Sequence, residues 1–407
     1  MLGRAFSRDG SWTRLGAGGV LAAAYTGARL WLFWPARAGV GPTRYGDAVE
    51  YLRVSRLSLL SLQFYTEHKP FGYPLVLKIA GRDQALVVWL QLAVSIACWA
   101  FLAIVIARRV RGARVRWFAA ATVLLFSASW PIAQWDTLVL TESLSLSIFA
   151  LLAGLAFVYV DRPRRGLVVV LVSVALFFTA LRDANGLLAA IVLALVAITL
   201  AARRRRGVAM LLLGAAATCV LLVAATSSVR RWEILFADQI GKRVVANPTE
   251  LSYFRAHGMP LPAHLSSIIF SDTRGPHPAA SFEHDPRLAR FMPWFMSEAR
   301  PTYESYLLSH PADSVGAPLR KLPVMLSDSG LSTYRAPGFR ELPNVVEELI
   351  YPSDGGRLLS LELALLGVAA LGVLRGLWQR DWVLPLGLVL GSVPLAVFVW
   401  DGEPSEV

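Results

Sequence analysis

The sequence predicts an all-α polytopic membrane protein with about nine transmembrane helices. Of its 407 residues, 55% are hydrophobic and 17% are charged, whereas soluble domains carry about 25% charged residues. The apolar residues gather into runs close to the roughly 20 residues that cross a hydrocarbon core. Arginine clusters separate these runs at every second connection. The two cysteines lie inside apolar runs and predict neither a disulfide nor a zinc site.

The nine predicted spans divide the chain into three parts. Residues 1–227 hold seven spans, and residues 357–407 hold two more. Between them, residues 228–356 form a long connection that is large enough for a small domain of mixed secondary structure. The predicted spans cover residues 16–34, 84–107, 117–134, 138–160, 165–181, 187–202, 207–227, 357–376 and 381–400.

The placement of the arginines predicts the orientation. A net charge of +12 would suggest nucleic acid as the partner of a soluble protein. Here 17 of the 40 basic residues, all of them arginine, lie before the first span and after the second, fourth, sixth and eighth, so no nucleic acid is needed to explain them. The positive-inside rule places the N-terminus in the cytoplasm, and the odd-numbered connections and residues 228–356 outside the cytoplasmic membrane. Only four of the 40 basic residues are lysine, which is typical of a GC-rich, bacterial genome.

The first predicted span has a second interpretation, a cleaved signal peptide. Ala36-Arg37-Ala38 resembles a cleavage site. The apolar run of residues 16–34 is longer than a usual signal-peptide apolar region, which favours a retained span.

The first outer segment contains a candidate catalytic acid, Asp47. Apolar residues at positions 48, 51, 52, 54, 59 and 62 have approximately helical spacing. This predicts an amphipathic helix on the membrane surface, with Asp47 near its N-terminus and Glu50 one turn later. The alternative is that Asp47 is a first-turn acid that only stabilises the helix dipole.

A second element of the same segment reads Lys69-Pro70-Phe71-Gly72-Tyr73-Pro74-Leu75. Its prolines and glycine predict a rigid turn before an amphipathic stretch. Glu67, His68 and Lys69 are charged or titratable neighbours at this turn and are candidate substrate-binding residues. A solvated loop with ordinary charges is the alternative.

Charged residues at the outer ends of other spans are further candidates. Glu142 opens an apolar span, and a carboxylate in hydrocarbon costs about 2.5–3.5 kcal/mol, so it should line a protein interior or a wet cavity, or else cap a helix. Arg182 is the only basic residue of the short outer connections, and its guanidinium suits a phosphate. A structural pair with Asp183 or Glu142 is its alternative. Arg29 and Glu362 lie about five residues inside their spans; snorkelling would explain Arg29.

Together these elements resemble the GT-C superfamily of polytopic glycosyltransferases, which includes protein O-mannosyltransferases and lipid A aminoarabinose transferases. The resemblance covers about residues 10–227, a seven-span module. It rests on four elements in order: Gly46-Asp47-Ala48-Val49-Glu50-Tyr51, Lys69-Pro70-Phe71-Gly72-Tyr73-Pro74-Leu75, Leu140-Thr141-Glu142-Ser143-Leu144 and Leu181-Arg182-Asp183.

The resemblance implies transfer of a sugar from a polyprenyl-phosphate donor to a glycan, glycolipid or protein acceptor at the outer face of the membrane. Asp47 would be the general base, and Arg182, Lys69 and Arg29 would stabilise the leaving phosphate, normally with inversion. Glu142 and Glu67 would orient the acceptor or bind a divalent metal. Family members differ in metal use, and Glu283-His284-Asp285 is only a weak cluster. No GxxxxGK[ST] loop is present, so no nucleotide cofactor is expected.

Two other functions are compatible with the sequence. Intramembrane charges such as Arg29 and Glu362 also suit a transporter or flippase, although no paired repeat is found. A non-catalytic envelope assembly protein would use the aromatic residues of 228–356 for binding; an ordinary hydrophobic core also explains these. GT-C enzymes often have eleven to thirteen spans, so the sequence is either a short member or a truncated one.

Overall fold

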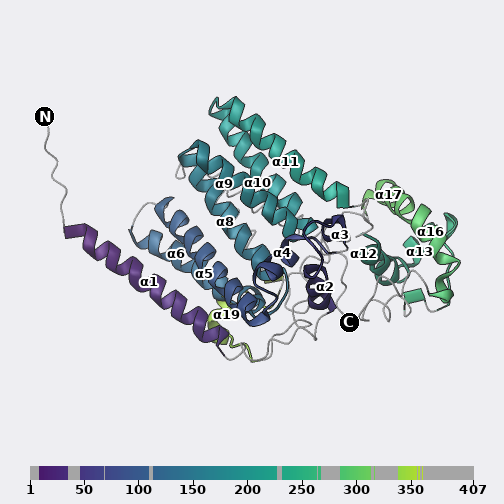
Figure 1. Cartoon of the computed structure of the whole chain (residues 1–407), viewed down its shortest axis with the longest axis horizontal. Coiled ribbons are helices and arrows are strands. Elements are labelled where there is room, and N and C mark those ends of the chain that lie inside the picture. The colour runs from purple at the N-terminus through teal and green to yellow at the C-terminus, as the bar shows by residue number, and fades with distance from the viewer. Residues whose placement is uncertain are drawn as a thin grey trace. The chain divides into compact units, whose positions relative to one another are not determined.

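The computed structural model contains helices throughout the part of the chain that it describes, and no strand occurs there (Figure 1). The described residues are 9–34, 46–67, 69–109, 113–226, 232–263, 265–266, 285–312, 316, 338–354, 356–357 and 360. The prediction of an all-α protein is therefore confirmed for this part of the chain.

The chain divides into two units, each built from segments that are distant in sequence. The first unit comprises residues 1–40, 83–167 and 335–351, and the second comprises residues 41–82, 168–334 and 352–407. The helices of the first unit are α1 (Asp9–Phe33), α5 (Gln84–Arg109), α6 (Ala113–Ala128), α7 (Trp130–Ala133), η3 (Gln134–Thr137), α8 (Glu142–Asp161) and α19 (Asn344–Ile350).

The second unit holds most of α9 and two long apolar helices that pack against each other, with shorter helices before and after them in the sequence. These helices are α2 (Gly46–Ser55), α3 (Leu62–Thr66), α4 (Gly72–Ile79), α9 (Arg165–Leu181), α10 (Asp183–Ala202), α11 (Arg206–Thr226), α12 (Trp232–Gln239), η5 (Ile240–Val244), α13 (Pro248–Ala256), η6 (Pro286–Leu288), α16 (Phe291–Trp294), η7 (Phe295–Ala299) and α17 (Arg300–Ser309).

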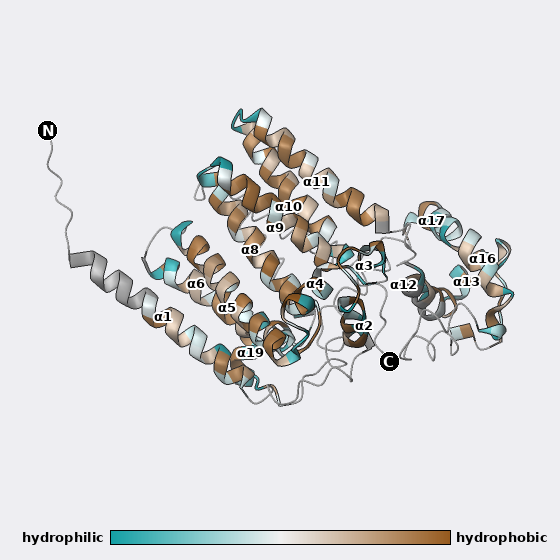
Figure 2. Ribbon diagram, in the orientation of Figure 1, coloured by the Kyte–Doolittle hydropathy of each residue, from teal (hydrophilic) through white to brown (hydrophobic). Residues whose placement is uncertain are grey.

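Within the described residues, four helices are long and apolar enough to cross a membrane: α5, α8, α10 and α11 (Figure 2). A fifth span is present if Arg114–Ala128 and Trp130–Thr137, which meet at 59°, are counted as one broken span. Helix α9 has 17 residues and is shorter. Helix α1 coincides with the first predicted span but does not belong to this apolar set. The predicted spans 357–376 and 381–400 lie almost entirely outside the described residues.

Arginines mark the ends of the apolar helices. Helix α5 ends with Arg108 and Arg109, and α10 ends immediately before Arg203. Helix α9 begins at Arg165 and α11 begins at Arg206. A guanidinium is costly inside hydrocarbon, so these residues fix where an apolar helix can end. This is why the sequence predicts these boundaries within a few residues.

Helix α2 differs from the predicted surface helix in its length and in what its apolar face contacts. It ends at Ser55, and its apolar residues Ala48, Tyr51 and Val54 are buried within the protein. Tyr51 meets Tyr73 of α4 edge to face, with 5.0 Å between ring centroids. The apolar face of α2 therefore packs against the protein core and not against a membrane surface. Leu59 and Leu62, which lie beyond the end of α2, are exposed.

The aromatic residues after α11 build a core of their own. Phe254, Phe291, Phe295 and Tyr306 are completely buried and pack in one cluster with the nearly buried Trp294. These aromatic residues therefore form a hydrophobic core, which is the alternative to a binding surface given for this segment above.

Candidate functional site

An ion pair joins the two motifs of the first outer segment. The Lys69 ammonium donates to Oδ1 of Asp47 at 2.7 Å, between the turn before α4 and the first turn of α2. The Asp47 side chain is 50% exposed and the Lys69 side chain 24% exposed. The Lys69 ammonium also lies 5.5 Å from the centre of the Tyr51 ring. A carboxylate and an ammonium thus meet at a site that a ligand can reach.

A second cation, Arg182, lies near enough to Lys69 for its charge to act on that residue. Burial lowers the pKa of Lys69, the Asp47 carboxylate raises it, and the positive charge of Arg182 lowers it again; the net pKa is above that of a free lysine. Lys69 is therefore protonated throughout the physiological range. Arg182 precedes α10 in an extended conformation, and the turn is closed by the Asn185 amide, whose Nδ2 donates to the Phe178 carbonyl at 3.1 Å.

Gly72 brings the Lys69 turn against the end of α9. A Cβ atom on Gly72 would lie 2.6 Å from the carbonyl carbon of Ala180 and 2.9 Å from the nitrogen of Leu181. Real Cβ atoms do not approach backbone so closely, so only glycine permits this contact. The contact explains how two motifs that are more than 100 residues apart place Lys69 and Arg182 near each other.

Replacement of Gly72 by alanine should therefore separate α4 from the end of α9. We expect a loss of about 1–3 kcal/mol in stability, as for an overpacked core, measured by thermal unfolding of the purified protein. The matched control is Gly214→Ala in α11, where no atom lies within 4 Å of the added methyl group; there alanine should stabilise by about 0.5–1 kcal/mol. Equal melting temperatures for Gly72→Ala and wild type would contradict the close contact.

Arg53 links two further predicted residues, Glu50 and Glu67. Its Nε donates to Glu50 at 2.9 Å, and its Nη2 and Nη1 donate to the two Glu67 oxygens at 2.7 and 3.3 Å. Gln63 adds a hydrogen bond of 2.8 Å to Glu67. The hydrogen bonds to Glu67, followed by those to Glu50, outweigh burial and raise the pKa of Arg53. Arg53 was not predicted; the Glu50–Arg53 spacing of three residues on a helix is the signal that indicates it.

The predicted residues Arg29 and Glu142 belong to the first unit, and Asp47, Glu50, Glu67, Lys69 and Arg182 belong to the second. Glu142 lies in the first turn of α8, half-buried, and receives a hydrogen bond of 3.3 Å from the Thr141 hydroxyl.

Some predicted residues lie outside the described part of the chain: His68, Glu362, and Glu283 and His284 of the weak cluster. Asp285 is paired with Arg287, and the hydrogen bond from Arg287 lowers the pKa of its carboxyl.

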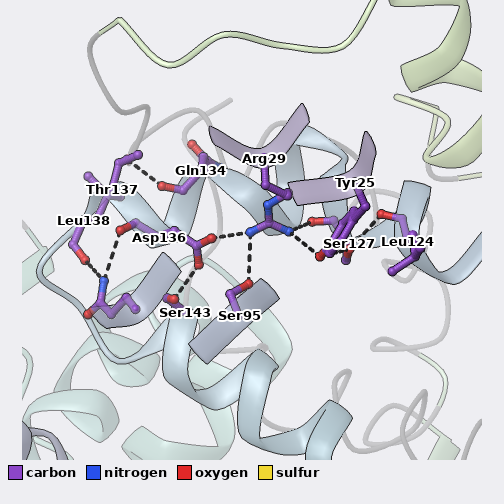
Figure 3. Close-up of polar contacts among 11 residues, drawn as sticks. Tyr25, Arg29, Ser95, Leu124, Ser127, Gln134, Asp136, Thr137, Leu138 and Ser143 are labelled. Atoms are coloured by element: carbon purple, nitrogen blue, oxygen red, sulfur yellow. Dashed lines mark hydrogen bonds and ion pairs between the residues drawn. The ribbon is translucent and has the colours of Figure 1, made fainter. Parts of the chain in front are cut away.

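Arg29 is held in a buried ion pair with Asp136 of η3 (Figure 3). The two side chains are 1% and 2% exposed. Arg29 also donates to Ser95 Oγ at 3.0 Å and to the Ser127 carbonyl, and Asp136 accepts from Ser143 at 2.6 Å. Arg29 therefore lies in the protein interior with a carboxylate partner, in contrast to the snorkelling arrangement weighed for it.

Asp136 was not singled out from the sequence. It lies in Trp135-Asp136-Thr137, in a connection that the predicted topology treats as a short outer turn. In the structure it lies in the second helix of the bent pair Arg114–Ala128 and Trp130–Thr137, where it is buried. A buried carboxylate needs a cation, and Arg29 in the first predicted span was the available signal.

The question of a divalent metal stays open as a prediction. The described residues contain no group of three or more histidine, cysteine, aspartate or glutamate side chains that could hold an ion. Of the two acids considered for a metal, Glu67 is paired with Arg53, and Glu142 accepts a hydrogen bond from the Thr141 hydroxyl.

No family model, curated protein or solved structure matches this chain. The fold alone defines a class of protein: its described part is all-helical and contains four helices, or five with the broken span, that are long and apolar enough to cross a membrane.

Proposed function

We propose that this chain is a glycosyltransferase of the GT-C type in the cytoplasmic membrane. It transfers a sugar from a polyprenyl-phosphate donor to a glycan, glycolipid or protein acceptor on the outer face. The observation that supports this best is the accessible Asp47–Lys69 pair with Arg182 beside it. This transfer needs a base that accepts a proton and positive charge that stabilises the released phosphate. One carboxylate next to two cations supplies both.

The reaction can be written on these residues. The acceptor hydroxyl oxygen attacks the anomeric carbon, and Asp47 takes the hydroxyl proton. The bond between the anomeric carbon and the phosphate oxygen breaks, and its electron pair leaves with the polyprenyl phosphate. Lys69 and Arg182 stabilise the charge on this phosphate. Arg53, held by Glu50 and Glu67, fixes α2 and the turn before Lys69 in one arrangement.

The proposal is tested first by the products that the cell makes. A deletion strain should lack one saccharide from its envelope glycans or glycolipids, detected by mass spectrometry, and should accumulate the lipid-linked sugar. An unchanged glycan profile at confirmed loss of the protein would overturn the proposal.

Lys69→Gln and Arg182→Gln should each reduce transfer by about 10²–10³-fold if each cation stabilises the leaving phosphate. The measurement is transfer by purified protein from a synthetic polyprenyl-phosphate sugar. The control is Arg300→Gln, which changes a cation of an exposed pair with Glu304 and should leave transfer unchanged. Full activity of both glutamine variants would remove the phosphate role from these residues.

A second candidate function is a transporter or flippase for the lipid-linked saccharide. The broken span and its buried Arg29–Asp136 pair favour it, because discontinuous helices and intramembrane charges occur on translocation paths. Both amide atoms of Gln134 are also buried without a hydrogen-bond partner in the part of the chain that the structure describes. Movement of the lipid-linked saccharide from one leaflet to the other in vesicles that contain the protein, without sugar transfer, would favour this candidate.

A further inference from the structure

The connection between α2 and α3 presents apolar side chains outward. Leu59, Leu60 and Leu62 are 41%, 97% and 76% exposed, and Tyr65 is 42% exposed. These four residues, which we call the leucine tip, lie within seven positions of one another. Such a group is a larger apolar surface than a solvated turn normally carries, and it indicates a contact with something apolar.

Several backbone polar groups of the leucine tip are already hydrogen-bonded within the turn. The Ser61 amide donates to the Ser58 carbonyl at 3.1 Å, and the Leu60 amide donates to the Ser58 hydroxyl at 3.2 Å. The Tyr65 hydroxyl donates to the Leu59 carbonyl at 3.0 Å. These bonds lower the cost of taking the turn out of water, because a backbone group that enters an apolar medium without its hydrogen bond is costly.

Lys78 of α4 fixes the base of the same turn. Its ammonium donates to the carbonyls of Ser55 and Leu57 at 3.1 and 2.5 Å, at the C-terminal end of α2. Helix α4 in turn contacts the end of the apolar helix α9 through Gly72. The leucine tip is thus attached to one of the apolar helices through close contacts.

We propose that the leucine tip inserts into the lipid bilayer, among the acyl chains next to the headgroups. The chain carries helices suited to a membrane, so lipid is the apolar medium at hand. Tyr65 has an apolar ring and a polar end, as aromatic residues at membrane interfaces do. Arg56, exposed at the start of the turn, supplies a positive charge for anionic headgroups.

Insertion of the leucine tip would fix the depth of the Asp47–Lys69 pair. Asp47 precedes Ser55 by eight residues of one helix, a distance of about 12 Å along its axis. The pair would then lie near the headgroups, where a lipid-borne phosphate is held. The insertion itself does not depend on the proposed transfer reaction, and it is tested without an activity measurement.

The test places a fluorescent label at the tip in the full-length protein. Cys98 and Cys219, both buried and free, are replaced by alanine, and Leu60→Cys carries a bimane. The protein is placed in nanodiscs of phosphatidylcholine and phosphatidylglycerol, with or without a nitroxide near the carboxyl end of the acyl chain. We expect the nitroxide to reduce the fluorescence at least about twofold, since an inserted apolar face lies roughly 5–10 Å into this layer. Aqueous iodide should have little effect.

Three further variants make the result decisive. Leu62→Cys tests the tip independently, because its side chain is also exposed. Leu221→Cys on the exposed face of α11 provides the lipid-facing reference, and Thr249→Cys at an exposed position of α13 provides the reference for iodide. Quenching of both tip positions by iodide alone would show that the tip lies in water and overturn the proposal. Protection of both positions from both quenchers would show that protein covers the tip, and would overturn it equally.

Discussion

Replacement of Asp47 by asparagine is expected to reduce sugar transfer by about 10²–10⁴-fold, the usual contribution of a general base. An amide has nearly the shape of the carboxylate but cannot take up the acceptor proton. Because the Asp47 side chain is half exposed, the substitution should leave the packing of α2 intact. The measurement compares envelope glycans of a deletion strain complemented with wild type or with Asp47→Asn at equal expression.

A control is needed because Asp47→Asn also weakens the ion pair with Lys69. Asp83→Asn is a suitable one: Asp83 caps α5 by accepting from the amides of Ala85 and Leu86, and asparagine caps equally well. We expect wild-type transfer from it. A wild-type glycan profile from Asp47→Asn would reduce Asp47 to a first-turn acid and favour the transporter or assembly function instead.

The role of the ion pair can be separated from the role of the base. If Asp47 mattered only as the partner of Lys69, then Asp47→Asn and Lys69→Gln would have equal effects, and the double variant would be no worse than either. If Asp47 accepts the proton, Asp47→Asn should be the more severe variant at every pH at which the wild type is active.

The apolar helices could be predicted from the sequence because local information determines them. The predicted span 84–107 is helix Gln84–Arg109, and the predicted span 207–227 is helix Arg206–Thr226. In both, a long apolar run is bounded by arginine. The break in the third span was missed, although Ser129 and Pro131 stand at the point where the helix stops and starts again.

The candidate site was predictable in part. Asp47, Lys69 and Arg182 were chosen for their chemistry, and the structure brings Asp47 into contact with Lys69 and places Arg182 near it. Gly72 belongs to one of the predicted motifs, but its contact with Ala180 depends on tertiary packing that no local pattern contains. The same holds for Arg29 and Asp136, which pair across 107 positions of sequence.

Replacement of Arg29 by methionine is expected to destabilise the protein by about 3–5 kcal/mol, because it leaves Asp136 buried without its cation. The Ser143 hydroxyl remains as a donor to Asp136, but it carries no charge. The measurement is the midpoint of unfolding in detergent micelles as denaturing detergent is added. The control, Arg300→Met in an exposed pair, should cost at most about 1 kcal/mol.

The double variant Arg29→Met with Asp136→Leu separates a structural pair from a functional one. Removing both charges and keeping apolar volume is often neutral or stabilising, so stability should return to near the wild-type value. If the double variant is stable and still transfers sugar, the pair only holds α1 against the broken span. If it is stable but has lost translocation of the lipid-linked saccharide, the charges themselves act on the substrate, and the transporter function gains the stronger support. Wild-type stability of the single Arg29→Met variant would show that Asp136 is not held by Arg29 at all.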